Sequence, residues 1–550
     1  MQVWDRSLDR RGSLAGARGL CTAWLSLLLF APPVLAATPV LTDFSLTHSY
    51  TCGPRYFRLH GADIESGVTI KLVQAGQPDI VGSVEYNYIA TGEGDYLWGY
   101  FDLSDGTAGG SWSVTAINPG GESATLPDVL EVVPNCPRGA AGDLYVCNSK
   151  MNNIVQYDWD TRKFVCIFTG ATTWAETVET ELERPERLAW APNGELLVTS
   201  LPPFSPGGVV IRYDGNTGGF LGYLVPPPAD GNPKPRGLTF GGPEGNLYNQ
   251  AAVSSNGVVI DVITKQYQYD HVSSTWGFVS DTPGLVMMPP MVKPYEARWA
   301  SNGNLLVIGD TMGSPVPTLR EYEYDAGSDS YEVIAEVVDL GEKFGIVESL
   351  DGLFYDVVES NWHRVDRYST DPLVLVDTLV PTAACMDLPP NPPPCAFEAM
   401  RSPFDLVYAP DGHLLVSARE TAVPDPRPGS GYYMAGAIHQ FDPATGDQLS
   451  IIGKLDFWDG KPPNVERLWR PFGMAFKPMP CDYASARGTF SGDWVVDLAD
   501  CEKLTANMLG PGLQPTNPHA LLSFDNDRDG DIDLADFAAF QRAFGSSLSD

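Results

Sequence analysis

Short stretches of alternating apolar and polar residues recur along most of the chain, separated by turns rich in glycine, asparagine and proline. Residues 68–73 and 112–117, for example, alternate with period two, which is typical of strands with one buried face. Glycine and proline contribute 55 and 47 of the 550 residues, and this composition favours short strands and turns over long helices. We therefore predict a mainly β protein.

Residues 38–137 contain the first group of such strands and predict a small β-sandwich. The segment 110–124, GSWSVTAINPGGESA, resembles the end of IPT/TIG immunoglobulin-like domains, in which a G-x-W/Y-x-V-x-V-x-N-P-G-G-x-S stretch is common. The resemblance implies an Ig-like domain over residues 38–137. Such a domain serves as a spacer or carries a binding function that the fold alone does not define.

A repeated unit runs through residues 139–480: a proline, a short apolar strand, a tight turn and a second strand. Clear copies occupy 185–198, 294–307 and 403–416, and weaker copies begin at Pro235 and near Phe344. A last copy at 471–478 has no strands after it, whereas the strands of 142–170 have no copy before them. Joining the two would close a ring of sheets and remove its exposed edges. The pattern predicts a six-bladed β-propeller, closed by pairing 471–478 with the strands of 142–170.

The propeller strands carry a family resemblance. Residues 143–158, DLYVCNSKMNNIVQYD, are similar to the NHL pattern, and the repeat resembles the NHL and gluconolactonase-like six-bladed propellers. Enzymes of the gluconolactonase-like group hold a metal over the channel with acidic and asparagine side chains at the starts of the inner strands. The six matching positions here include one acid, so the resemblance does not extend to that metal cluster. These positions are Glu186, Arg236, Tyr295, Phe344, Phe404 and Phe472.

Two kinds of side chain near these starts are candidates for chemistry. Glu296 and Asp405 lie one position later and could pair as acid and base. The aromatic residues among the starts either stack on a sugar at the channel mouth or pack between blades. Streptogramin-lyase-like propellers need histidines at these positions, and none is present. The histidines elsewhere in the repeat region are predicted to be surface or packing residues. They are His271, His363, His413 and His439.

The connections between propeller strands differ in length on the two faces. The long ones all fall on one face, called here the long-loop face, which is where binding sites are normally built on a rigid scaffold. They are 171–184, 200–208, 226–234, 271–293, 308–318, 380–402, 417–436 and 453–470.

The most specific motif lies at 525–536, DNDRDGDIDLAD. It has side-chain oxygens at loop positions 1, 3, 5, 9 and 12, a glycine at position 6 and an apolar residue at position 8. This is the pattern of an EF-hand-like loop that surrounds Ca²⁺ with six to eight oxygens. The predicted ligands are Asp525, Asp527, Asp529, Asp531 through its carbonyl, Asp533 and Asp536.

Position 12 of this loop is an aspartate and a helix is predicted after it, a combination that resembles the type I dockerin repeat. A degenerate second copy lies 36 residues upstream, with Trp494 where glycine is expected. The resemblance implies a dockerin-like, helical domain over residues 481–550, a cohesin-type protein partner and an association with polysaccharide breakdown. The weaker second calcium site would use Ser491, Asp493, Asp497 and Asp500.

The N-terminal 36 residues indicate export. Four arginines precede an apolar run from 20 to 35 that ends in small residues, as in a signal peptide. We therefore expect a secreted, extracellular protein without a membrane span in the mature chain. The net charge of −34 disfavours nucleic acid as a partner.

Eight cysteines follow the predicted signal peptide, an even number that suits an oxidising compartment. Proximity in the sequence suggests three bridges. Cys147 and Cys166 fall on the first and third strands of a meander, too far apart to pair, and are predicted to be buried thiols. The suggested bridges are Cys52–Cys136, Cys385–Cys395 and Cys481–Cys501.

The leading hypothesis is a secreted, calcium-binding, non-catalytic protein. Its propeller would bind a carbohydrate or another small ligand on the long-loop face, and its C-terminal domain would attach it to a cohesin-like surface protein. One rival is a propeller enzyme, namely a lactonase, lyase or glycan-active hydrolase, that carries the same tail. Another is a purely structural surface protein.

Overall fold

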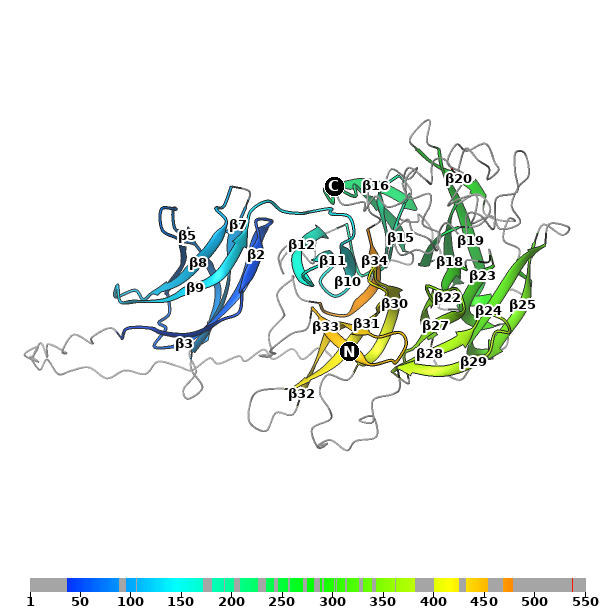
Figure 1. The fold of residues 1–550 in the computed structure, drawn as a ribbon. Helices are drawn as coiled ribbons and strands as arrows, with labels where there is room; N and C mark the ends of the chain where they lie inside the picture. The colour runs from blue at the N-terminus through cyan, green and yellow to red at the C-terminus, as the bar shows by residue number, and fades with distance from the viewer. Residues whose placement is uncertain are drawn as a thin grey trace, which may run out of the picture.

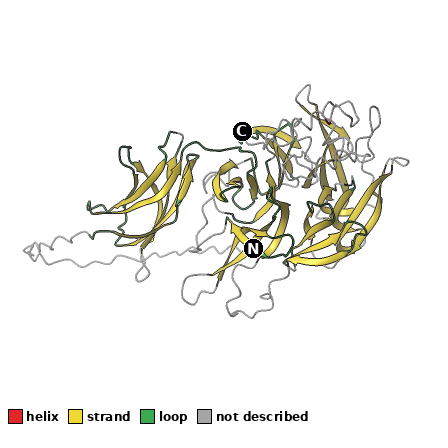
Figure 2. Cartoon of the chain, in the orientation of Figure 1, coloured by secondary structure: helices red, strands yellow, loops and turns green. Residues whose placement is uncertain are grey.

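The computed structural model describes two groups of β-sheets (Figures 1 and 2). Every described element is a strand, apart from a helical conformation at Phe537. No helix within the described part of the chain is long and apolar enough to cross a membrane. The described residues are 37–88, 95–104, 106–171, 181–191, 193–201, 208–225, 234–241, 246–255, 258–270, 275–280, 287–288, 291–300, 302, 304–311, 314–325, 330–338, 343–361, 363–380, 400–424, 432–453, 468–477 and 537.

The first group is a β-sandwich of two sheets. One sheet has the order β1 (Val40–Phe44), β3 (Gly53–Ala62), β7 (Asp95–Leu103), β6 (Ser83–Tyr88). The other has the order β2 (His48–Tyr50), β9 (Ser123–Val133), β8 (Gly110–Ile117), β4 (Thr69–Val73), β5 (Ile80–Val81). Both sheets contribute to one apolar core, in which Phe57 and Phe101 stack at a centroid distance of 4.5 Å beside the buried Trp112. Period-two alternation places these side chains on the inner faces.

The second group contains six sheets among the described residues, each with four antiparallel strands, and in one of them β21 adds a parallel edge strand. The innermost strands are β34, β13, β17, β22, β26 and β30. The sheets comprise β10 (Leu144–Asn148), β11 (Asn153–Asp158), β12 (Lys163–Gly170) and β34 (Pro471–Phe476); β13 (Pro185–Trp190), β14 (Leu196–Ser200), β15 (Val209–Tyr213) and β16 (Phe220–Val225); β17 (Lys234–Gly241), β18 (Asn246–Ser255), β19 (Val258–Asp270) and β20 (Thr275–Ser280); β22 (Met291–Trp299), β23 (Leu305–Thr311), β24 (Ser314–Asp325), β25 (Ser330–Val338) and β21 (Met287–Met288); β26 (Lys343–Glu348), β27 (Phe354–Glu359), β28 (Arg364–Ser369) and β29 (Leu375–Val380); and β30 (Met400–Tyr408), β31 (Leu414–Pro424), β32 (Tyr432–Phe441) and β33 (Gln448–Ile452).

The innermost strands follow one another around a ring. β34 contacts β13, and the series continues through β17, β22, β26 and β30, which contacts β34 again. This arrangement is a β-propeller. The predicted pairing of the two ends of the repeat region is confirmed, because β34 pairs antiparallel with β10, with Phe476 opposite Leu144. The first sheet is therefore completed by the last strand.

The repeated proline marks a β-bulge at the start of the innermost strands. The register with the neighbouring strand shifts between Pro185 and Arg187 in β13, and comparable shifts follow Pro294 in β22 and Pro403 in β30. Proline has no N–H to donate to the ladder, so the pairing is interrupted there at little cost. A bulge also re-aims the side chains beside it, and this positions the residues described in the next section.

The sandwich contacts the first propeller sheet directly. The guanidinium of Arg55 donates to the carbonyl of Val165 at 2.8 Å and lies 4.6 Å from the ring of Phe164. The Tyr50 hydroxyl donates to Asp158 Oδ2 at 2.7 Å. β3 and the end of β2 are therefore fixed against β11 and β12 by polar contacts as well as packing.

The described cysteines follow the prediction. The Cys52–Cys136 disulfide is formed and joins residues 84 positions apart, and Cys147 and Cys166 are free and buried. The predicted bridges Cys385–Cys395 and Cys481–Cys501 lie outside the described residues, as do the signal segment 1–36 and all predicted calcium ligands.

Candidate functional site

The third position of each repeated unit lies two residues after the proline, or after Lys343 in the copy near Phe344, on the innermost strands that contact one another around the ring. Around the ring this position reads Arg187, Gly237, Glu296, Gly345, Asp405 and Gly473, so charged residues alternate with glycines. The glycines permit close approach of neighbouring strands. A Cβ on Gly473 would lie 2.8 Å from Arg187 Cα, and one on Gly345 would lie 2.9 Å from Asp405 Cα.

The three charged side chains form a cluster that we call the channel triad. Arg187 Nε lies 2.6 Å from Glu296 Oε2, and Arg187 Nη1 lies 3.2 Å from Asp405 Oδ1. The side chains are 4 %, 0 % and 1 % exposed for the arginine, the glutamate and the aspartate. Arg298, two residues after Glu296 in β22, adds a contact of 3.3 Å from its Nε to Glu296 Oε1. The triad thus links β13, β22 and β30 across the axis.

Backbone and hydroxyl groups fix the triad in place. The Met474 N–H donates to Asp405 Oδ2 at 2.9 Å, and Arg187 Nη2 donates to the Phe344 carbonyl at 3.0 Å. Ser417 Oγ accepts from the Asp405 N–H and donates to the Phe472 carbonyl at 2.7 Å. These bonds tie the triad to two further innermost strands, β26 and β34, so five of the six sheets contribute to it.

Three of the aromatic strand starts pack around the triad. Phe344 stacks on Phe404 at 5.0 Å between ring centroids, and Phe404 meets Phe472 edge-on at 4.1 Å. The Arg187 guanidinium lies 4.5 Å from the Phe404 centroid, within cation–π range. Phe404 and Phe472 are buried and Phe344 is partly exposed. These rings pack between blades; the side chains of Tyr295 and Arg236 are outside the described part.

The electrostatics of the triad favour a charged arginine. Burial raises the pKa of the Glu296 carboxyl to about 7, although Arg187 and Arg298 oppose the shift. Burial also acts to lower the pKa of Arg187, but the carboxylates of Asp405 and Glu296 outweigh it, and the net direction is upward. Arg187 is therefore the permanent positive centre of the channel.

This geometry limits what Glu296 and Asp405 can do chemically. The structure brings both carboxyls together, as their shared place in the repeat suggested, but it places a guanidinium between them. A general acid or base must reach a substrate atom within hydrogen-bond distance, and neither side chain is exposed. Among the described residues, the triad is a buried ion cluster that joins three innermost strands.

The sequence interpretation named the two carboxylates and missed Arg187. The signal was present in the alignment of the repeats, where the third position carries one cation and two anions separated by glycines. A cation and two anions at the same position of a buried repeat are expected to form ion pairs with one another, because isolated buried charges are unfavourable. The bulges that direct these side chains inward are not visible in the period-two pattern.

The described histidines of the propeller lie in packing or turn positions. His439 is fully buried, its ring bonded to Thr421 Oγ1 at 2.9 Å and to Gln448 Oε1 at 3.0 Å, and burial lowers its pKa to about 4. His413 lies beside Asp411 in a turn. Neither is near the channel triad in the contacts it makes, which agrees with the packing role that the sequence favoured.

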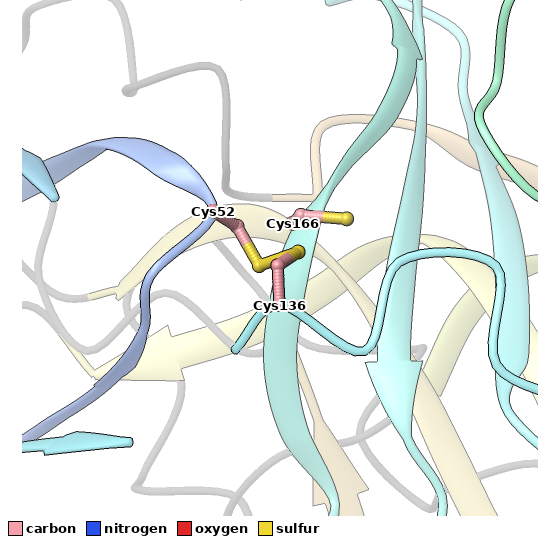
Figure 3. Close-up of side chains that lie close together, drawn as sticks. All are labelled: Cys52, Cys136 and Cys166. Carbon is pink, nitrogen blue, oxygen red and sulfur yellow. A yellow bond between two sulfur atoms is a disulfide. The ribbon is translucent and has the colours of Figure 1, made fainter. Parts of the chain in front are cut away.

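One group of potential soft-metal ligands occurs among the described residues. The sulfur atoms of Cys52, Cys136 and Cys166 lie within 4.8 Å of one another where the sandwich meets the propeller (Figure 3). Two of these sulfurs are consumed by a disulfide, so the group does not offer three thiolates to a metal in this state.

Comparison with known proteins leaves the family open. No protein-family model matches the chain, and no curated protein matches it. Solved structures align over much of its length. An auxiliary nutrient binding protein from Bacteroides ovatus is 11 % identical, with 69 % of this chain and 95 % of that chain covered and a TM-score of 0.32. A putative 6-phosphogluconolactonase from Bacteroides fragilis is 14 % identical, with 62 % and 99 % covered and a TM-score of 0.34. A protein from Lactobacillus plantarum is 13 % identical, with 61 % and 98 % covered and a TM-score of 0.36. Because these identities and TM-scores are low, the assignment of the propeller fold depends on the strand pairing described above.

Proposed function

We propose that this chain is a secreted modular binding protein whose propeller is a rigid, non-catalytic platform for a carbohydrate or another small ligand. The observation that carries the proposal is the channel triad. The two carboxyls best placed by the repeat for acid–base chemistry are buried against Arg187, where they brace the ring from within. Recognition is then assigned to the long-loop face, whose predicted connections lie largely outside the described residues. Two of the predicted loops are shorter than expected, because β23 and β24 extend into 308–318 and β31 and β32 extend into 417–436.

The attachment half of the proposal comes from the sequence. The loop at 525–536 carries the spacing of a calcium site, and its dockerin resemblance implies a cohesin-like protein partner linked to polysaccharide breakdown. The signal-like segment 1–36 supports export. The Ig-like resemblance of residues 38–137 fits a spacer, and the polar contacts of Arg55 and Tyr50 would keep that spacer against the propeller.

A combined binding and turnover screen tests the platform. The full-length chain is applied to a glycan array and, separately, to a set of lactone, ester and glycoside substrates. We expect retention on a subset of glycans and no turnover. The variants Glu296→Gln and Asp405→Asn should retain the same glycans, because the triad side chains are buried.

Two outcomes would contradict the proposal. Turnover of a substrate that either substitution abolishes would make the channel carboxyls catalytic and favour the enzyme alternative. Absence of any glycan or small-molecule retention by folded protein would favour a structural role.

A further inference from the structure

We propose that Cys166 is an internal nucleophile that can move the disulfide of the sandwich onto the propeller, converting Cys52–Cys136 into Cys136–Cys166 and releasing the thiol of Cys52. The observation behind this is the juxtaposition of one free thiol and one disulfide at the interface of the two β-structures, with all three sulfurs within 4.8 Å of one another.

The three cysteines come from separate parts of the fold. Cys52 lies between β2 and β3 of the sandwich, Cys136 follows β9 in the connection to the propeller, and Cys166 lies within β12 of the first propeller sheet. The contacts of Arg55 with Val165 and Phe164 hold β3 against β12. The free thiol therefore lies in a strand at a packed interface, and the two bridged cysteines lie in the connections that pack against that strand.

The free thiol lies close to both sulfurs of the bridge. Figure 3 shows the Cys52–Cys136 disulfide with the side chain of Cys166 beside it, and all three sulfurs lie within 4.8 Å of one another. Thiol–disulfide exchange proceeds by attack of a thiolate on one sulfur of the bridge and departure of the other. The exchange proposed here is attack on Cys136 with departure of Cys52, and the peptide map below distinguishes it from attack on Cys52.

The step is balanced without any external oxidant or reductant. The Cys166 thiol gives its proton to solvent base, and its thiolate forms a bond to Cys136 Sγ. The Cys136–Cys52 bond breaks, its electron pair leaves on Cys52 Sγ, and that sulfur takes up a proton. One disulfide and one thiol are present before and after, so only the position of the bridge changes.

The local environment explains why the exchange would be slow near neutral pH. Burial raises the pKa of the Cys166 thiol to about 11, although the nearby Arg138 and Arg55 act in the opposite direction. Since the thiolate is the nucleophile, the rate should rise about tenfold for each pH unit below that value. The consequence of exchange is a change in accessibility, because Cys166 is 2 % exposed whereas Cys52 is only partly buried.

The test follows the position of the free thiol. The full-length oxidised protein is incubated at pH 7, 8 and 9 without added thiol, labelled with N-ethylmaleimide at pH 6.5, digested with pepsin at low pH and mapped by mass spectrometry. We expect peptides linked through Cys136–Cys166 together with label on Cys52, accumulating about tenfold faster per pH unit. Circular dichroism verifies that the protein remains folded throughout.

Matched variants separate this exchange from unrelated disulfide chemistry. Cys166→Ser should keep the Cys52–Cys136 bridge at every pH, and Cys147→Ser, which removes the other buried thiol, should behave as the parent chain. In Cys52→Ser, treatment with oxidised glutathione should close Cys136–Cys166. The proposal is overturned if the bridge of the parent chain never moves, or if Cys136 and Cys166 fail to join in folded Cys52→Ser.

Discussion

At the residue scale, the channel triad shows how a single side chain decides the role of two others. Glu296 and Asp405 could be selected from the sequence because both follow a repeated proline by two positions. Their role could not be predicted, because it depends on Arg187, which reaches them from a strand more than a hundred residues earlier in the chain. Arg187 places a guanidinium between the two candidate residues, so the pair that the repeat aligns is part of a buried ion cluster.

The raised pKa of Glu296 gives a pH dependence with a definite sign. The folded protein holds the proton of the Glu296 carboxyl more tightly than the unfolded chain does. The stability that this proton contributes is therefore fully present below about pH 4.5 and is lost as the pH rises through about 7. Glu296→Gln removes the titration. Between pH 5 and pH 8 the parent chain should lose about 1 to 3 kcal/mol of its free energy of unfolding that Glu296→Gln does not lose.

Urea unfolding of both proteins at the two pH values measures this difference. Glu332→Gln is a suitable control, because Glu332 is an exposed residue of the same sheet, and its curves should parallel those of the parent chain. An equal pH dependence in the parent chain and Glu296→Gln would show that Glu296 does not titrate in this interval.

At the element scale, the sequence predicted the propeller strands well and the details of their pairing poorly. The proline, strand, turn and strand unit located β13, β22 and β30, and the unpaired copy at 471–478 correctly predicted the partner of β10. The short parallel strand β21 was not anticipated, since two residues carry no periodicity. The bulges were also missed, because they add one residue on one strand without altering its composition.

The glycine at the third position of β34 is expected to be essential for packing between sheets. In Gly473→Ala the added methyl would meet backbone atoms, namely Arg187 Cα and Glu186 O, each at 2.8 Å. Backbone cannot move aside as a flexible side chain can, so we expect a loss of about 1 to 3 kcal/mol in the free energy of unfolding.

Thermal and urea unfolding provide the measurement. In the control variant Gly219→Ala the nearest atom to the methyl is Thr217 Oγ1 at 3.2 Å, a side-chain atom in an exposed turn, so a change within about 0.5 kcal/mol is expected. Equal stability of Gly473→Ala and the parent chain would mean that β34 and β13 are less closely packed than described.

At the scale of the whole molecule, a mainly β chain with a sandwich followed by a propeller could be predicted from strand periodicity and repeats. The contacts that hold the two together could not, because Arg55, Tyr50 and Asp158 carry no motif and meet only in three dimensions. The C-terminal calcium loop is the reverse case: its spacing is informative in the sequence, and it lies outside the described residues.

Calcium binding by that loop is a prediction about how the molecule is attached. We expect calorimetry to detect Ca²⁺ binding by the full-length chain, and the double substitution Asp527→Ala with Asp529→Ala to weaken it by at least about tenfold, or about 1.4 kcal/mol. The same change in the degenerate copy, Asp493→Ala with Asp497→Ala, should have a smaller effect. Unaltered binding in the first variant would place the calcium elsewhere.

The pairing of β34 with β10 also constrains the order in which the protein can be made. The first propeller sheet is synthesised early but lacks its innermost strand until residue 476 has been added. Until then β10 has an open edge, which is a template for pairing with other chains. A chain interrupted anywhere between the first sheet and β34 would expose that edge permanently. Completion of the ring therefore comes late in biosynthesis, and truncated products are expected to aggregate.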